Sequence, residues 1–190
     1  MKRYVKSAVS NWSSEDFSIK RELASDPNTY LTTLKELALD DNRFVRKSVA
    51  SNPSTTAEIL KLMITDKYVG VRESIVNNPN VTPELLMAMI EDTNEDIRVA
   101  IINSDKVTEN ILRKMVENNI DDDMWYIADR KKSSADTLKF IYEKSDKDDF
   151  SIRRKLARNP NTPDDVLKNL ASDSYPSVSI PAKKRLGLEK

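Results

Sequence analysis

The chain has 190 residues and a formal net charge of zero, from 31 basic and 31 acidic side chains. It contains no Cys and no His, which excludes disulfides, thiolate nucleophiles and Cys-ligated metal centres, and removes the commonest general base. Its two glycines, Gly70 and Gly187, cannot form a GxGxxG or GxxxxGK phosphate loop or a GxSxG nucleophile elbow. The composition therefore predicts a non-enzymatic protein without cofactors.

The hydropathy pattern predicts neither a membrane span nor a secretory leader. The longest apolar run, LLMAMI at 85–90, is far shorter than the roughly 20 residues of a transmembrane helix. The basic segment MKRYVKSAVSNW at 1–12 is not followed by the apolar stretch of a signal peptide. We therefore expect a cytoplasmic protein.

A repeat with a 26-residue period runs along the chain. Its units begin at Ala24, Ala50, Val76, Ile102, Ala128 and Ala157. Ten residues into the units stand Leu34, Leu60, Leu86, Leu112, Leu138 and Leu167. Three residues further on stand Leu37, Met63, Met89, Met115, Ile141 and Leu170. This separation is typical of one buried stripe on a helix, so each unit is expected to bury a helix against its neighbours.

The first helix of each unit is expected to span about 10–12 residues. Asx-Pro pairs mark its approach, because the residue before Pro avoids the helical region. Caps are predicted at Thr56, Thr82, Thr108, Ser134 and Thr162. A first-turn Pro is expected at Pro83 and Pro163. Examples of the predicted helices are Thr56–Thr65, Thr82–Glu91 and Thr162–Ala171.

A second, shorter helix is predicted in each unit by the patterns FVRKSVA, VGVRESIV, DIRVAII and FSIRRKLA. The segment EDFSIKRELA at 15–24 has the same form and is interpreted as the second half of an incomplete first unit. At the C-terminus, SIPAKKRLGLEK is expected to form a cap, in which Pro181 starts a last turn and Gly187 ends it.

Two charged positions repeat together. The predicted ladder consists of Asp40, Asp66, Asp92 and Asp173 in the turns and of Arg46, Arg72, Arg98 and Arg153 near the start of the second helices. Each Arg is expected to pair with an Asp of its own repeat or of a neighbouring repeat. The alternative interpretation is a basic stripe that binds phosphate, and the joint recurrence of both charges favours the ladder.

The pattern xVRxxVAxNPxTPxxxLxxLAxD resembles the leucine-rich-repeat-variant family, a relative of HEAT-like helical repeats. The clearest copies are FVRKSVASNPSTTAEILKLMITD, VRESIVNNPNVTPELLMAMIED and IRRKLARNPNTPDDVLKNLASD. The resemblance covers roughly residues 13–186 and implies a right-handed superhelical α-solenoid, usually a binding scaffold. Some relatives carry a Cys-ligated cluster beside the repeats, an activity that a chain without Cys cannot share.

The predicted fold is accordingly all-α, a right-handed α-solenoid of about six two-helix repeats in a single domain, 1–190. Residues 1–23 form an N-terminal partial repeat or cap, 24–173 the repeats and 174–190 the C-terminal cap. One two-helix unit cannot bury its apolar stripe alone, whereas stacked units bury a continuous core.

The repeat is irregular between residues 121 and 132. An acidic triplet, an aromatic pair and a basic triplet replace the usual residues there: Asp121, Asp122, Asp123, Trp125, Tyr126, Arg130, Lys131 and Lys132. Met124 replaces the ladder Arg, and a three-residue insertion follows near 144–149. Trp, Tyr and Arg are enriched at interface hot spots, so this segment is either a recognition patch or a unit with irregular packing. A magnesium site is disfavoured, because consecutive helical residues point about 100° apart.

Charge is distributed unevenly along the chain. Residues 50–127 hold 7 basic and 14 acidic side chains, whereas residues 128–190 hold 15 basic and 10 acidic ones. An acidic middle and a basic C-terminal third would orient a partner more than they would add affinity. A protein with the opposite pattern is the simplest partner.

The first functional hypothesis is a scaffold, of adaptor or inhibitor type, that holds a protein or peptide on a concave surface lined by the second helices. Besides the segment 121–132, its predicted contacts are Arg43, Lys47, Tyr68, Glu73 and Arg154. The alternative is nucleic-acid binding by the basic C-terminal third. That surface would include Arg130, Lys131, Lys132, Arg153, Arg154, Lys155 and Arg158. The acidic middle would repel a duplex.

An enzyme is the third hypothesis. Some HEAT-like solenoids are DNA glycosylases that place an aromatic residue and an acid near the scissile base. Asp123 and Trp125 resemble that pair only weakly, and no matching motif surrounds them. No catalytic residue is predicted.

Overall fold

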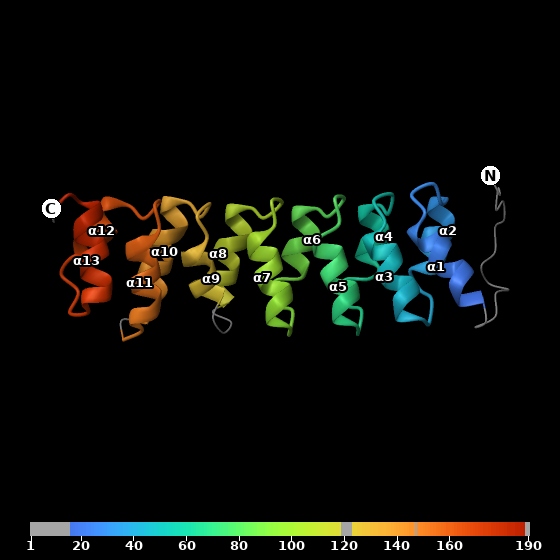
Figure 1. The fold of residues 1–190 in the computed structure, drawn as a ribbon, viewed down its shortest axis with the longest axis horizontal. Coiled ribbons are helices and arrows are strands. Elements are labelled where there is room, and N and C mark those ends of the chain that lie inside the picture. The colour runs from blue at the N-terminus through green and yellow to red at the C-terminus, as the bar shows by residue number, and fades with distance from the viewer. Residues whose placement is uncertain (1–15, 119–122, 147, 189–190) are drawn as a thin grey trace. The chain divides into compact units, whose positions relative to one another are not determined.

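The structure is a computed structural model that describes residues 16–118, 123–146 and 148–188. Within these ranges the regular structure consists of thirteen helices and no strands (Figure 1), so the predicted all-α class is confirmed. The chain divides into two compact units, Met1–Lys106 and Val107–Lys190, which we call unit 1 and unit 2.

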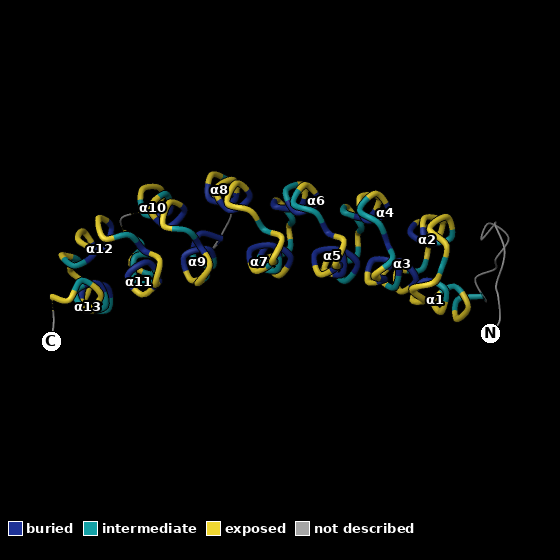
Figure 2. The backbone as a smooth tube through the Cα atoms, turned by 90° about the horizontal axis from the view of Figure 1, so that it is seen from above, coloured by how far each residue is buried: buried dark blue, intermediate teal, exposed yellow. Residues whose placement is uncertain are grey.

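The helices of unit 1 form two rows (Figure 2). The odd row consists of α1 (Phe17–Ser25), α3 (Arg43–Ser51), α5 (Val69–Val76) and α7 (Glu95–Asn103). The even row consists of α2 (Leu31–Leu37), α4 (Ala57–Lys61) and α6 (Pro83–Ala88). Helix α3 packs between α1 and α5, and α5 also packs against α7. Helix α1 takes its place in the odd row, as expected for the second half of an incomplete repeat.

Unit 2 has the same arrangement. Its odd row consists of α9 (Asp123–Asp129), α11 (Phe150–Arg158) and α13 (Pro176–Arg185). Its even row consists of α8 (Glu109–Asn118), α10 (Ala135–Lys144) and α12 (Asp164–Leu170). Helix α11 packs against both α9 and α13, so each odd helix again lies beside the next.

The core of each unit lies where its two rows meet (Figure 2). Every apolar residue that the sequence period places at the start of a repeat, or ten or thirteen positions further on, is buried. Burying one of the Leu, Ile, Val or Met side chains in this set contributes about 1.5–3 kcal/mol, and the two rows share that burial among neighbouring helices. The predicted core positions are therefore confirmed.

The even helices α2, α4, α6 and α12 are shorter than predicted, and in their repeats the second helix is the longer one. Helix α4 has 5 residues and α6 has 6, against 8 in α5 and 9 in α7, the second helices of the same repeats. The cause is a tightening of the chain after each short helix. The N–H of Leu62 bonds to Ile59 O and that of Met63 to Leu60 O, the i→i+3 pattern of a 3₁₀ turn. In unit 2, α8 and α10 reach 10 residues.

The predicted helix starts are mostly present. The hydroxyls of Thr82 and Ser134 accept the N–H groups of Leu85 and Thr137. Thr162 is a correction, because Pro163 is the residue at the N-cap of α12.

The reason is register within the repeat. Counted from the Asn of the Asn-Pro pair, Thr162 is equivalent to Thr55 and not to Thr56. Both threonines donate to a backbone carbonyl six residues earlier, Thr55 to Val49 O and Thr162 to Leu156 O, each at 2.6 Å. Thr162 thus closes the turn before the helix.

Buried asparagines join consecutive odd helices. The side-chain amide of Asn52 donates to Ala24 O at 2.9 Å and to Asp26 O at 3.0 Å. Asn78 does the same to Ala50 O at 2.7 Å and Asn52 O at 3.0 Å. These carbonyls lie at helix ends, where the backbone has no intrahelical donor. Each Asn therefore satisfies the end of the preceding odd helix.

The same contact recurs in unit 2 and ends with an arginine. Asn159 donates to Ala128 O at 2.8 Å and to Arg130 O at 3.0 Å. Arg185 lies one period after Asn159 and donates to the carbonyl oxygens of Asn159, Pro160 and Thr162. A longer side chain with more donors thus takes the place of the amide at the last turn.

The C-terminal cap differs in one respect from its prediction. Pro181 lies inside α13 and does not start a turn, because Pro176 already occupies the first turn of that helix, where proline is well tolerated. Gly187 ends the helix as predicted, with φ 69°. The N–H of Leu188 bonds to Lys183 O and that of Gly187 to Lys184 O, which is the Schellman arrangement.

Replacing Asn78 by Ala removes two donors from buried carbonyl oxygens. We expect Asn78→Ala to lower the free energy of unfolding by about 2 kcal/mol, measured by urea denaturation. The adjacent, exposed Asn77 is the matched control, and Asn77→Ala should change it by less than about 0.5 kcal/mol. Equal effects of the two substitutions would contradict a structural role for Asn78.

Candidate functional site

The repeated Arg and Asp side chains form ion pairs between consecutive repeats. Arg46 binds Asp66 through two nitrogens, with N···O distances of 2.5 and 3.0 Å, and donates to Asp40 O at 2.8 Å. Arg72 binds Asp92 at 2.6 and 2.8 Å. Each Arg thus reaches back to the turn of its own repeat and forward to the Asp of the next.

The ladder begins and continues with related contacts. Lys20 pairs with Asp40 at 2.8 Å at the start of unit 1, and Arg153 pairs with Asp173 at 2.6 Å in unit 2. Arg98 is buried and donates to Asp92 O at 2.8 Å. Arginines engaged in this way are not available to phosphate groups, so the contacts favour the structural interpretation over a basic stripe.

These contacts change the ionisation of the carboxyl groups. Burial raises the pKa of Asp66, but the hydrogen bonds from Arg46 and from the N–H of Tyr68 lower it more, so the net pKa lies below its ordinary value. Burial likewise raises the pKa of Asp92, but the hydrogen bonds from Arg72 and from the N–H of Asn94 lower it more. The carboxylates are therefore stabilised as ions inside the fold.

A second set of charged residues lies on the exposed surface of the odd row in unit 1. Arg21 on α1, Lys47 on α3 and Glu73 on α5 occupy equivalent positions in successive copies of the repeat. All three are exposed. In the part of the chain that the structure describes, none of them has an ion-pair partner. Their charges are thus unneutralised at the surface.

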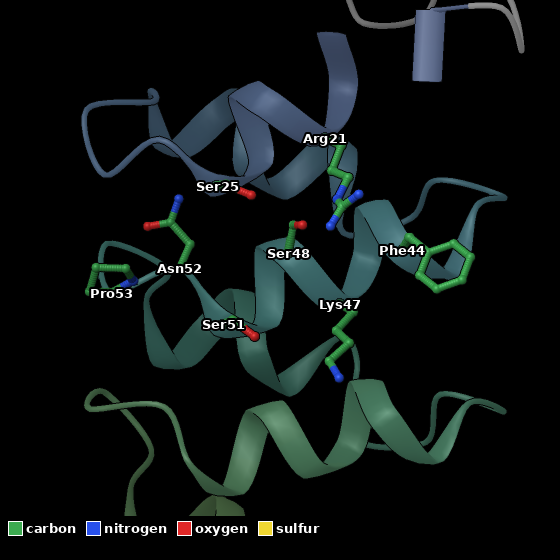
Figure 3. Close-up of a pocket in the computed structure, with 8 residues that line it drawn as sticks. All are labelled: Arg21, Ser25, Phe44, Lys47, Ser48, Ser51, Asn52 and Pro53. Carbon is green, nitrogen blue, oxygen red and sulfur yellow. The ribbon is translucent and has the colours of Figure 1, made fainter. Parts of the chain in front are cut away.

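Two adjoining hollows run across these helices, each of about 220 Å³. The first lies along α1 and α3 (Figure 3), and Arg21, Ser25, Phe44, Lys47, Ser48, Ser51, Asn52 and Pro53 line it. The second is lined by Lys47, Ser51, Glu73, Ser74, Asn77 and Asn78. Because Lys47 and Ser51 line both, the hollows adjoin across α3, and we call them together the α1–α5 groove.

The charged side chains enter different parts of this groove. Arg21 points toward Ser48 across the gap between α1 and α3, whereas Lys47 points toward α5 (Figure 3). The Lys47 amine lies close to Gly70 on α5, where an added Cβ would be 3.6 Å from Nζ. The two cations are therefore directed at separate places.

Phe44 lines the first hollow, and other aromatic side chains lie near it at the start of the odd helices. The Arg43 guanidinium lies 3.9 Å from the centre of the Tyr68 ring and 4.8 Å from that of Phe44. Phe17 contacts Phe44 edge-on, with ring centres 6.5 Å apart. The structure thus brings four predicted contacts together in two pairs, Arg43 with Tyr68 and, in the second hollow, Lys47 with Glu73.

The irregular segment 121–132 is only partly a surface. Asp121 and Asp122 lie outside the described residues. Asp123 is a correction: it is only 1 % exposed and cannot meet a partner from solvent, because its place in α9 faces the helices packed around it. Lys131 and Lys132 are exposed, and Arg130 is half-buried.

Trp125 has a structural role in unit 2. It is half-buried, and the Lys155 amine lies 3.8 Å from the centre of its ring. The same amine pairs with Asp129 at 2.8 Å, and Tyr126 contacts the Trp125 ring edge-on at 5.0 Å. These contacts hold α9 to α11 and account for part of the irregularity. Arg154, also predicted as a contact, is half-buried with its guanidinium 5.9 Å from the Phe150 ring.

Several residues of the α1–α5 groove were not among the predicted contacts: Arg21, Ser25, Ser48, Ser51 and Asn77. The signal that identifies them is the period itself. Arg21 stands one period before Lys47, and Ser25, Ser51 and Asn77 are spaced in the same way. Extending the register of the repeat to exposed positions would have predicted the groove.

The described ranges contain no cluster of three or more acidic side chains placed to hold a metal ion. None of the helices within them has the length and hydrophobicity needed to cross a membrane. Comparisons of the chain with protein-family models, with curated proteins and with solved structures found no match.

The lowered pKa values of Asp66, Asp92 and Asp173 predict a loss of stability in acid. A group whose pKa is lower in the folded state stabilises the fold above its unfolded pKa of about 3.9 and loses that contribution as pH falls through the folded value. We expect the free energy of unfolding to decrease as pH falls below about 4, measured by urea denaturation at several pH values.

The control for this pH dependence is Asp92→Asn, which removes one of the titrating ladder carboxylates. Its free energy of unfolding should be lower at neutral pH and should depend less steeply on pH below about 4. A slope identical to that of the unaltered chain would show that Asp92 does not contribute to acid unfolding.

Proposed function

We propose that the chain is a non-enzymatic binding scaffold, a right-handed α-solenoid of about six two-helix repeats that holds a protein partner along its odd helices. Support for the solenoid comes from the regular sequence period and from the Asn and Arg–Asp contacts that recur at that period inside each unit. Repeats that each contact their neighbours build extended binding surfaces.

The observation that carries the binding role is the difference between neighbouring residues on one helix. Arg46 is buried in the ladder, whereas Lys47, the next residue, is exposed and has no ion-pair partner among the described residues. Arg72 and Glu73 differ in the same way on α5. Of each two neighbouring residues, one charged side chain is therefore engaged in an ion pair inside the fold and the other is exposed at the surface.

The extent and polar lining of the groove favour a macromolecular partner. Its two hollows, each of about 220 Å³, adjoin over three helices, whereas a typical small-molecule site is one concave pocket lined mainly by apolar side chains. A row of exposed charges and hydroxyls across three helices instead suits the side chains of a protein laid over the surface.

A protein fits better than a nucleic acid. Of the basic residues in the C-terminal third, Arg153 is paired with Asp173, and Lys155 is paired with Asp129 while covering Trp125. The α1–α5 groove also contains Glu73, which would repel a phosphate backbone. Two of the cations predicted for a nucleic-acid surface are thus engaged inside unit 2, and the groove of unit 1 combines cations with an acid.

Affinity capture from host lysate tests this proposal, with a charge reversal in the groove. We expect the unaltered chain to retain a discrete protein after nuclease treatment, and Lys47→Glu to retain at least about fivefold less of it, because a favourable contact becomes a repulsive one.

Lys61→Glu is the matched control for this capture. It makes the same change of charge on an exposed residue of α4, in the even row, and should retain the protein normally. Loss of all captured material after nuclease would favour nucleic-acid binding. Equal capture by both variants would contradict a binding role for the odd row in unit 1.

A further inference from the structure

We infer that the α1–α5 groove binds an extended segment of the partner that carries two acidic residues and one basic residue at intervals of three residues. This inference rests on the proposed scaffold function and specifies the chemistry that the groove recognises.

The order of charges along the groove sets the order in the ligand. Passing from α1 to α3 to α5, the exposed side chains are Arg21, Lys47 and Glu73, that is, positive, positive and negative. A complementary segment therefore presents acid, acid and base. Like charges placed opposite one another cost several kcal/mol, which makes such a pattern selective.

The spacing follows from helix packing. Helix α3 packs directly against both α1 and α5, and the axes of packed helices lie about 8–10 Å apart. A chain in the extended polyproline II conformation has three residues per turn and advances about 3.1 Å per residue, so residues three apart lie on one face about 9 Å from each other. The three charges thus correspond to residues i, i+3 and i+6 of the ligand, in either chain direction.

Polar side chains beside the charges favour an extended backbone. Ser25, Ser51 and Asn77 repeat at the C-terminal ends of the three helices, and each lies in the groove. Asn77 donates to Glu73 O and keeps its side-chain oxygen as an acceptor. Hydroxyls and amides can bond the free N–H and C=O groups of an extended chain, whereas a helix has already satisfied its own.

Two separate carboxylates fit the groove better than one phosphate group. A phosphate would need cations that converge on one point, but Arg21 is directed into the gap between α1 and α3 while Lys47 is directed at α5 (Figure 3). Each cation can therefore meet a different acidic side chain.

The test uses the full chain and short end-capped, fluorescently labelled peptides of Ser and Thr that carry Glu, Glu and Lys. In the spaced peptide the charged residues stand three residues apart, and it is made in both chain directions, Glu-Glu-Lys and Lys-Glu-Glu. In the other, of the same composition, they are adjacent. Because an exposed ion pair contributes up to about fivefold in affinity, anisotropy titration should show the spaced peptide to bind at least about fivefold more tightly.

Substitutions that reverse the charge of groove residues identify which of them contact the peptide. Glu73→Lys should reverse the preference, so that a spaced peptide with three Glu binds about fivefold more tightly than the original. Lys47→Glu should weaken the spaced peptide by about tenfold, and Lys61→Glu should leave it unchanged. Circular dichroism of each variant verifies that the fold is retained.

The inference is overturned if neither peptide binds, if both bind equally, or if Glu73→Lys does not change the preference. If the chain binds both peptides equally but Lys47→Glu still reduces the amount of captured protein, the scaffold function stands and only the charge register is wrong. Should capture also be insensitive to Lys47→Glu, the proposed function itself fails.

Discussion

The fold of each unit depends on hydrogen bonds from one repeat to the backbone of the repeat before it. An Asx-Pro turn ends α1, α3, α5 and α11, and the carbonyl oxygens at the ends of the odd helices are left without helical donors. The amides of Asn52, Asn78 and Asn159 supply those donors from the following odd helix. Hydrophobic burial holds the two rows together, but it is not directional. The amide contacts therefore set how successive helices align.

The Arg–Asp pairs add a second connection of the same kind. The guanidinium groups of Arg46 and Arg72 each join the turn of their own repeat to the carboxylate of the next, as Arg46 does with Asp40 O and Asp66. A buried ion pair adds little net stability compared with apolar packing, but it is costly to break. Its effect is to penalise any misalignment of neighbouring repeats, which leaves the exposed residues at a regular spacing.

Much of this arrangement could be predicted from the sequence, because buried positions obey the period. The apolar stripe and the recurring Asp and Arg are all visible as a regular repeat. The length of the even helices was not visible, since the i→i+3 tightening after Leu60 depends on where the next turn must begin. The direction of pairing was not visible either, because Asp40, six residues before Arg46, and Asp66, twenty residues after it, were equally plausible partners.

The candidate site was harder to predict than the fold. Trp125 was prominent because it interrupts the repeat, but only the structure shows that Lys155 of the next odd helix covers it. Arg21 was overlooked because its repeat is incomplete, although it obeys the period. Departures from a repeat thus indicate where packing changes, whereas exposed residues that keep the period indicate where a partner can bind.

The central claim is that adjacent residues on one helix have separate roles, Arg46 in the fold and Lys47 at the surface. The most direct test is urea denaturation of Arg46→Met and Lys47→Met. We predict that Arg46→Met lowers the free energy of unfolding by about 3 kcal/mol, because it leaves Asp66 buried and unpaired. Lys47→Met should change it by less than about 0.5 kcal/mol. Similar losses in both variants would contradict the claim.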